Sequence, residues 1–232
     1  GKHHIDEYKS IVKLRNLKNK EIYPIGYGKM DILNNGLIQK GNKSKTKPKI
    51  LIAPSWGKSN LLETLGIKLA LALSSKGYEV VIRPHQMICD NNSKLYRDIL
   101  LLTKNDTNIF LESSLNGDGA IYDSDLLIGD YSGISLEFAA ITRNPVISVN
   151  VEKKVKNSEW EKHNLIPLEI SIRDKIGALV EPDIDQILIA VEKLLNANKK
   201  TKTKVLDQFL INRKSKCSTI ASQKIIELLS KK

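Results

Sequence analysis

The sequence predicts an α/β fold built on a doubly wound parallel sheet, and three observations support this prediction. Short, continuously apolar runs recur along the chain, as in strands that are buried on both faces. Segments with an apolar residue at every third or fourth position separate these runs, as in amphipathic helices. The 232 residues, 41% of them hydrophobic, are enough for a globular domain of this size. We therefore expect a Rossmann-like arrangement.

Four segments between residues 49 and 104 make up the first half of the predicted fold. The apolar runs "KILIAP" (49–54) and "YEVVIRP" (78–84) are predicted to be strands. Residues 60–77 have the apolar spacing of a helix and end at Gly77, a residue typical of helix C-termini. Residues 93–104 show the same spacing and are predicted to form the next helix.

The second half continues this alternation to about residue 150 and ends in two helices. We expect strands at 108–112, 125–130 and 144–150, with a helix over 133–142 between the last two. The apolar spacing of residues 183–197 and 218–232 predicts two further helices.

Composition favours a soluble, intracellular protein without a metal site. No stretch approaches the roughly 18 to 20 apolar residues of a membrane span, and the first residues lack the apolar part of a signal peptide. Cys89 and Cys217 are too few for a disulfide framework and lack zinc-binding spacing. The histidines also lack the spacing of metal ligands. They are His3, His4, His85 and His163. We expect no metal and no cofactor.

The net charge of +11 suggests an anionic partner, which could be nucleic acid, anionic lipid or a phosphorylated substrate. Much of the excess lies in two lysine-rich runs, 40–49 and 198–204, whose composition is that of solvated loops. Aromatic residues make up only 5% of the chain and are not interleaved with these runs. We therefore do not expect nucleic acid as a partner.

Polar or glycine-bearing loops follow three of the predicted strands. They cover residues 54–59, 83–85 and 130–135. Ligands of such sheets bind beyond the carboxyl ends of the strands, so these loops are the expected site.

The loop "DYSGIS" at 130–135 has the features of a phosphate cradle. A helix that begins near Gly133 presents free amides, including that of Ile134, and the positive end of its dipole. Ser132, Gly133 and Ser135 are small enough to let a phosphate approach. Glu137 lies one helical turn further on, where its carboxylate could accept hydrogen bonds from ribose hydroxyls. The alternative is structural, in which Ser132 caps the helix, Asp130 closes a turn and Glu137 is a solvated surface residue.

Arg83 and His85 follow the second predicted strand. Arg83 offers a permanent charge suited to phosphate, and Pro84 restricts the turn. His85 could donate a proton to a leaving diphosphate or take one from an attacking hydroxyl. A single histidine at a strand end is more often structural, but its place on the same sheet edge as Ser132 favours a role in the site.

The loop after the first strand contains Gly57-Lys58-Ser59, which is not a P-loop because Ile52 stands where that motif needs a glycine. We expect Gly57 and Lys58 to lend their backbone amides to the site, and Ser55 to belong to the same nucleotide-binding loop. Trp56 is expected to form a wall of the acceptor site or to pack in the core.

The motifs "ILIAPSWG", "VVIRPH" and "DLLIGDYSGISLEFAAITRNPVI", in this order, resemble the C-terminal nucleotide-binding domain of the CDP-glycerol glycerophosphotransferase family. These enzymes are teichoic acid and capsule polymerases of GT-B fold. The resemblance runs from about Tyr23 to Ser148 and includes "GYGKMDIL" (26–33), which is similar to the segment that joins the family's two domains. It implies transfer of glycerol phosphate, or a related polyol phosphate, from a CDP-linked donor to a hydroxyl of a polymer or lipid-linked acceptor.

The resemblance also implies roles for individual residues. His85 matches the family's catalytic or diphosphate-binding histidine, Ser132 and Gly133 match its phosphate cradle, and Glu137 matches a ribose ligand. Gln86, Gly133 and Ser55 differ from the residues most frequent in the family, in ways that these roles tolerate.

The same resemblance implies a division of the chain into three parts. Residues 1–48 are expected to be an interdomain segment or the remnant of an N-terminal acceptor domain, and 49–198 the nucleotide-binding domain. Residues 199–232 are expected to be a basic linker and a helix that packs back. We expect activity to need the N-terminal domain, and we expect a cytoplasmic protein, peripheral on the inner face of the membrane.

Two other functions stay open at this point. A GT-B glycosyltransferase or epimerase that uses a UDP-sugar would share the phosphate cradle and the Glu137 ribose contact. A non-catalytic module that binds nucleotide or docks on an anionic membrane would share the basic charge.

Overall fold

The structure, a computed structural model, is built on a six-stranded parallel sheet and describes residues 1–40, 46–90, 94–113, 118–153, 162, 166–197, 202–210 and 216–231. The strand order is β3-β2-β1-β4-β5-β6, and every neighbouring pair is parallel. The predicted doubly wound parallel sheet is thus confirmed. His163 and parts of both lysine-rich runs, 41–45 and 198–201, lie outside the described residues.

Five of the six strands coincide with the predicted apolar runs. The strands are β1 (Lys49–Ile52), β2 (Glu79–Ile82), β3 (Ile109–Leu111), β4 (Leu126–Gly129), β5 (Val146–Val149) and β6 (Gly177–Val180). The sequence analysis did not predict β6. Its first residue, Gly177, lies so close to the carbonyl of Val146 that a Cβ at this position would clash with it.

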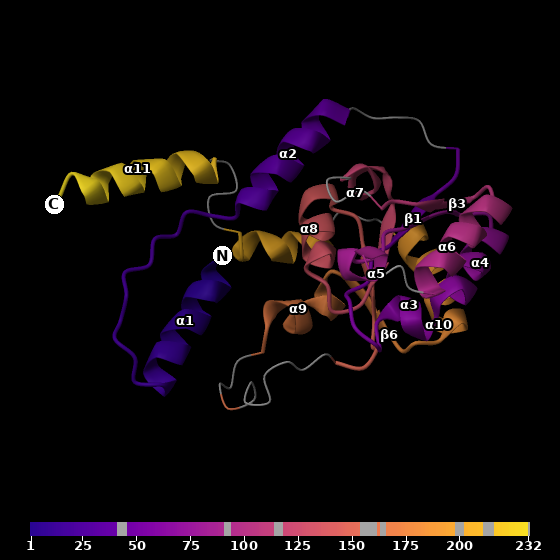
Figure 1. Cartoon of the computed structure of the whole chain (residues 1–232), viewed down its shortest axis with the longest axis horizontal. Coiled ribbons are helices and arrows are strands. Elements are labelled where there is room, and N and C mark those ends of the chain that lie inside the picture. The colour runs from indigo at the N-terminus through magenta and orange to yellow at the C-terminus, as the bar shows by residue number, and fades with distance from the viewer. Residues whose placement is uncertain are drawn as a thin grey trace.

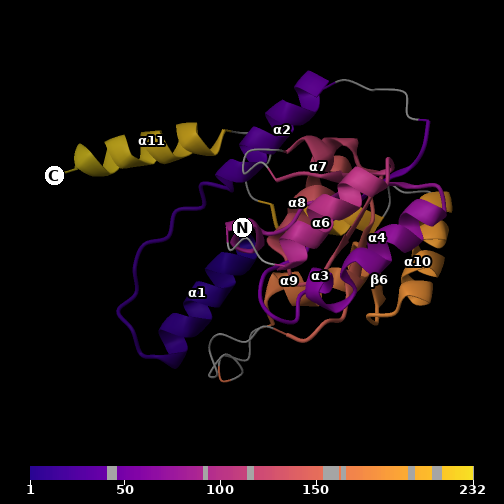
Figure 2. The same cartoon turned by 45° about the vertical axis from the view of Figure 1, so that its right-hand side comes forward.

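Helices cover both faces of the sheet (Figures 1 and 2). On one face pack α3 (Leu61–Thr64), α4 (Gly66–Ser75), α6 (Lys94–Asn105) and α10 (Ile184–Asn196). On the other pack α2 (Gly28–Lys40), α7 (Gly119–Asp123), α8 (Gly133–Thr142), α9 (Leu168–Ser171) and the 3-10 helix η3 (Lys202–Gln208). Successive residues of β1 show why both faces need cover, because Ile50 and Ile52 enter the first core and Leu51 the second.

The single helix predicted for residues 60–77 is divided in two. The side chain of Asn60 caps α3 and accepts hydrogen bonds from the amides of Leu62 (2.8 Å) and Glu63 (3.2 Å). Gly66 then has a φ of +45°, in the left-handed region that favours glycine, and α4 begins there. The apolar spacing continues across this break, which is why the sequence pattern alone did not reveal it.

Helices near the two ends of the chain extend from the sheet domain (Figures 1 and 2). They are α1 (Lys2–Leu14) and α11 (Cys217–Leu229). The amide of Cys217 donates to Asp31 of α2 at 2.7 Å, whereas Ile226 and Leu229 near the end of α11 are both 65% exposed. Among the described residues no helix is both long and apolar enough to cross a membrane.

Candidate active site

The three loops predicted to form the site lie on one edge of the sheet. β1 pairs with β2 on one side and with β4 on the other, and all three strands run in the same direction. The loops after them therefore emerge side by side, with the outer two about 10 Å apart, or two strand spacings. The helix α5 (Gln86–Asp90) follows the middle of these loops in the sequence.

A buried carboxylate connects two of these loops. Asp130 directly follows β4, and its side chain is almost fully buried. Its Oδ1 accepts a hydrogen bond from the Ser55 amide at 2.6 Å, and its Oδ2 accepts one from the Leu61 amide at 3.0 Å. Asp130 therefore does more than close a local turn, because it also fixes the loop after β1 and the start of α3.

An arginine supports the same loop from the other side. Arg173, in the 3-10 helix η2 (Arg173–Lys175), is 5% exposed, and its guanidinium lies over the ring of Tyr131 at 4.2 Å from the centroid. It also donates to the Val149 carbonyl at 2.6 Å and to the Asn150 side chain at 3.0 Å. Tyr131 and the start of α8 are thereby held against β5.

The loop after β1 brings Trp56 close to His85. Their ring centroids lie 6.1 Å apart, and Gly57, the residue after Trp56 in the loop, adopts a φ of +118°, in the region that favours glycine. A cavity of about 340 Å³ opens at this loop. Its lining residues are Ser55, Trp56, Gly57, Lys58, Ser59, Asn60, Tyr131, Glu152 and Lys153.

The ring of His85 is oriented by its own turn. The amide of Met87 donates to His85 Nδ1 at 3.2 Å, and the amide of Ile88 donates to the His85 carbonyl at 2.8 Å. Because Nδ1 acts as an acceptor, the proton of the neutral imidazole sits on Nε2. His85 therefore presents a hydrogen-bond donor on the side of the ring away from its turn.

The start of α8 is open where the phosphate cradle was predicted. Ser132 occupies the N-cap position, but its side chain makes no capping hydrogen bond, so the purely structural alternative for this residue is not supported. A Cβ added to Gly133 would meet no atom within 4 Å. The buried hydroxyl of Ser135 lies beside Gly129, and its amide donates to the Ser132 carbonyl at 3.1 Å. Its part in the cradle, which depends on its small size, stays a prediction.

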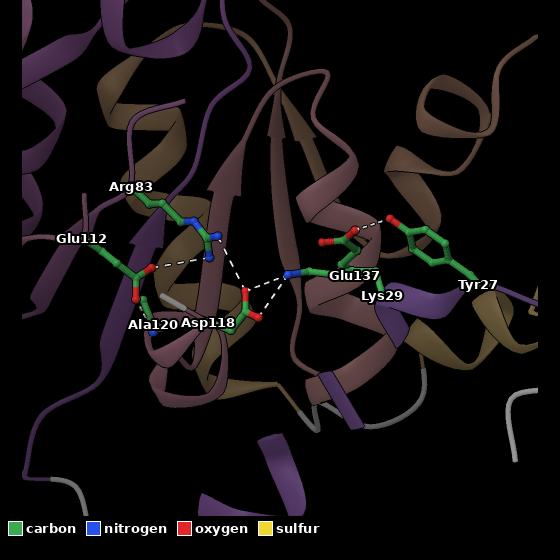
Figure 3. A network of polar contacts seen from close by, with 7 residues as sticks. All are labelled: Tyr27, Lys29, Arg83, Glu112, Asp118, Ala120 and Glu137. Atoms are coloured by element: carbon green, nitrogen blue, oxygen red, sulfur yellow. Dashed lines mark hydrogen bonds and ion pairs between the residues drawn. The ribbon is translucent and has the colours of Figure 1, made fainter. Parts of the chain in front are cut away.

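Glu137 lies one turn further along α8 and contacts Tyr27, which directly precedes α2. The Tyr27 hydroxyl donates to Glu137 Oε1 at 2.6 Å (Figure 3). Burial, followed by this hydrogen bond, raises the pKa of the Tyr27 phenol well above its usual value. Glu137 is therefore not a merely solvated surface residue.

A cavity of about 230 Å³ borders both Gly133 and Glu137. Its other lining residues belong to or directly adjoin α1, α2, α8, α9 and η3, and include His3, Tyr27, Met30, Leu136 and Phe209. The described residues that line it include neither Arg83 nor His85. The predicted site residues thus fall into two groups on one sheet edge.

Arg83 belongs to a network of charges shown in Figure 3. Its guanidinium lies 3.5 Å from Glu112 Oε2 and 3.6 Å from Asp118 Oδ1, and Lys29 Nζ contacts both Asp118 oxygens at 3.1 Å. The other Glu112 oxygen accepts a hydrogen bond from the Ala120 amide at 2.9 Å. Arg83 thus faces two carboxylates in this structure, and its part in phosphate binding stays a prediction.

Sequence reasoning missed most partners of the predicted residues. Tyr27, Lys29 and Asp118 were not expected at the site, and for Asp130 the only individual role considered was closing a turn, in the structural alternative. Tyr27 and Glu137 are 110 positions apart in the sequence, and Lys29 and Asp118 are 89 apart. The one sequence signal was the segment 26–33, whose resemblance marked it as a joining segment.

The part of the chain that the structure describes contains no group of three or more histidine, cysteine or acidic side chains arranged to hold a metal ion.

Comparison with known families assigns this domain. The family model of CDP-glycerol:poly(glycerophosphate) glycerophosphotransferases matches residues 6–159, which is more than half of the chain and includes β1, β2, β4 and α8. The chain belongs to this glycerophosphotransferase family. The resemblance found in the strand-end motifs is thus confirmed. No curated protein sequence matches the chain.

Solved structures of low sequence identity share the fold. The wall teichoic acid polymerase TagF, in a structure soaked with CDPG, has a TM-score of 0.50 at 17% identity, over 86% of this chain and 46% of that chain. A putative UDP-N-acetylglucosamine 2-epimerase from Listeria monocytogenes has a TM-score of 0.53 at 18% identity, over 90% of this chain and 53% of that one. The fold of this glycerophosphotransferase-family chain is therefore that of one half of a GT-B protein, and the chain spans about half the length of these structures.

Proposed function

We propose that this domain binds the CDP-linked donor in the transfer of glycerol phosphate, or a related polyol phosphate, to a hydroxyl of a polymer or lipid-linked acceptor. The observation that carries the proposal is the open start of α8, where Gly133 leaves room for a phosphate and Glu137 lies one turn away. The family match supports the same reaction class.

In this proposal the diphosphate lies at the N-terminus of α8. It would accept hydrogen bonds from the amides of Gly133 and Ile134 and from the Ser132 hydroxyl, which makes no capping hydrogen bond. The helix dipole would favour its negative charge. Glu137 would accept hydrogen bonds from the ribose hydroxyls through the oxygen that Tyr27 does not use. Ser55, Trp56 and Gly57 would border the diphosphate from the neighbouring loop, and Arg83 would add positive charge behind it.

His85 is proposed to act at the leaving group. The acceptor hydroxyl oxygen attacks the phosphorus that carries the glycerol, and the bond from this phosphorus to the CMP oxygen breaks. The hydroxyl proton passes to solvent water, and CMP leaves as the anion. Charge then builds up on the departing CMP, and the Nε2 proton of His85 would stabilise it. The sequence left two roles for His85, as a donor to the leaving group or as a base for the attacking hydroxyl. The donor at Nε2 favours the first role.

The positive charge of the chain is the observation that supports attachment to an anionic membrane in this proposal. The net charge is +11, and each lysine near an anionic surface contributes about 1 kcal/mol. A lipid-linked acceptor would place the reaction at such a surface, on the cytoplasmic side.

Calorimetric titration of the chain with CDP-glycerol, CDP, CMP and UDP-N-acetylglucosamine tests the proposal. We expect CDP-glycerol to bind at least about tenfold more tightly than UDP-N-acetylglucosamine, a difference of about 1.4 kcal/mol. Tighter binding of the UDP-sugar would favour the glycosyltransferase or epimerase alternative. If the chain sediments with anionic liposomes but binds none of these nucleotides, the non-catalytic module that docks on a membrane would be favoured.

A further inference from the structure

Two residues at the start of α2 contact carboxylates at the candidate nucleotide site. Tyr27 contacts Glu137, and Lys29, two residues later, contacts both oxygens of Asp118 (Figure 3). The first turns of α2 are themselves fixed, because Met30 and Leu33 are buried in the core on the same face as α8. The phenol of Tyr27 therefore approaches Glu137 from a rigid support.

A carboxylate that binds a ribose must present an oxygen in a defined direction. Glutamate has three rotatable side-chain bonds, and Glu137 is only partly buried, so packing alone does not select one rotamer. The Tyr27 hydroxyl, 2.6 Å from Oε1, supplies the missing restraint and leaves Oε2 available to a ligand. The 230 Å³ cavity beside Glu137 gives a ligand access to this carboxylate.

The raised pKa of Tyr27 is consistent with this arrangement. A tyrosine phenol is already protonated at physiological pH, and partial burial and the hydrogen bond to Glu137 raise the pKa of Tyr27 further, so it remains a donor.

We propose that Tyr27 is a positioning residue that orients the Glu137 carboxylate toward the two ribose hydroxyls of the donor nucleotide. The proposal rests on the proposed function, since it requires that Glu137 binds ribose. It differs from a blocking role, in which Tyr27 would occupy the place of the ribose and leave when the nucleotide binds. The two roles predict opposite effects of removing the hydroxyl.

The test compares CMP with 2′,3′-dideoxy-CMP by calorimetry on the wild-type chain, Tyr27→Phe, Glu137→Gln and the double variant. We expect Tyr27→Phe to weaken CMP binding about threefold to tenfold, the usual effect of freeing one long side chain at a binding site. Binding of the dideoxy compound, which lacks both hydroxyls, should not change. In the double variant the loss should equal that of Glu137→Gln alone, because the two residues act as one unit.

Tyr23→Phe is the matched control, because the Tyr23 hydroxyl also donates to a glutamate, Glu21, but is absent from the residues that line the cavity. It should leave the affinities for both nucleotides unchanged. Thermal unfolding of each variant verifies that the chain is folded at the temperature of the titration.

Each outcome has a distinct meaning. If the wild-type chain binds CMP and dideoxy-CMP equally, Glu137 is not a ribose ligand, and the proposed function at this residue fails together with the inference. If Glu137→Gln removes the preference for CMP but Tyr27→Phe leaves it intact, only the positioning role is overturned. Tighter CMP binding by Tyr27→Phe would also overturn it, in favour of a blocking role.

Discussion

The Asp130 carboxylate accepts a hydrogen bond from the Ser55 amide at 2.6 Å and thereby joins the loop after β4 to the loop after β1. The same carboxylate accepts from the Leu61 amide, at the start of α3. Two of the three loops at the candidate site are therefore positioned by one buried side chain. In the loop between β4 and α8, Asp130 therefore has a structural role, whereas Gly133 borders the cavity.

We predict that Asp130→Ala lowers the free energy of unfolding by about 3 kcal/mol, because it leaves two backbone amides without their charged acceptor. Urea unfolding followed by circular dichroism measures this loss. Asp130→Asn, which keeps an acceptor oxygen for one amide, should lose less. A loss below about 0.5 kcal/mol for Asp130→Ala would show that water or other groups replace the carboxylate.

The proposed role of His85 predicts separate effects on rate and on folding. In an enzyme that contains this domain together with the acceptor domain, His85→Ala should reduce CMP release from CDP-glycerol in the presence of acceptor by about 10²- to 10⁴-fold. The melting temperature should stay near that of the wild-type chain, since His85 is not part of either core cluster. His85→Gln places a donor near the position of Nε2 and should retain more activity than the alanine variant. Equal rates for wild type and His85→Ala would refute the role.

The cavity beside Glu137 carries a titratable wall residue, His3. Burial, followed by the charge of His4, lowers the pKa of His3 to about 4 from its usual 6.5. Because the pKa of His3 is lower in the folded chain than in the unfolded chain, the unfolded state binds more protons below pH 6.5. The neutral His3 ring therefore contributes fully to the free energy of unfolding above pH 6.5, and this contribution is lost as the pH falls toward 4.

We therefore expect the melting temperature to fall between pH 6.5 and pH 4, and to fall less in His3→Gln, which cannot be protonated. The analogous His4→Gln variant, one position away, controls for local changes in the helix. Parallel pH profiles for the wild-type chain and His3→Gln would contradict the burial of His3.

The parts of this protein that follow a local pattern could be predicted, and the parts that depend on tertiary contacts could not. Apolar runs identified β1 to β5, and parallel strands then required the loops at Trp56, His85 and Gly133 to share an edge. The contacts of Tyr27 and Lys29 join residues about one hundred positions apart, and no local pattern encodes them. The short strand β6 was missed because it begins with Gly177 and Ala178, two residue types that are depleted in strands.

The central claim is that a phosphate of the donor occupies the open space at Gly133. The most direct measurement is the calorimetric affinity of CDP-glycerol for Gly133→Ala, with Gly28→Ala as the matched control. Both glycines are the first residue of a helix, and an added Cβ meets no atom within 4 Å at either position. Both variants should therefore fold with unchanged or slightly higher stability. We predict that Gly133→Ala binds CDP-glycerol at least about tenfold more weakly while Gly28→Ala binds it normally, a loss of about 1.4 kcal/mol or more. Equal affinity for Gly133→Ala and the wild-type chain would contradict the claim.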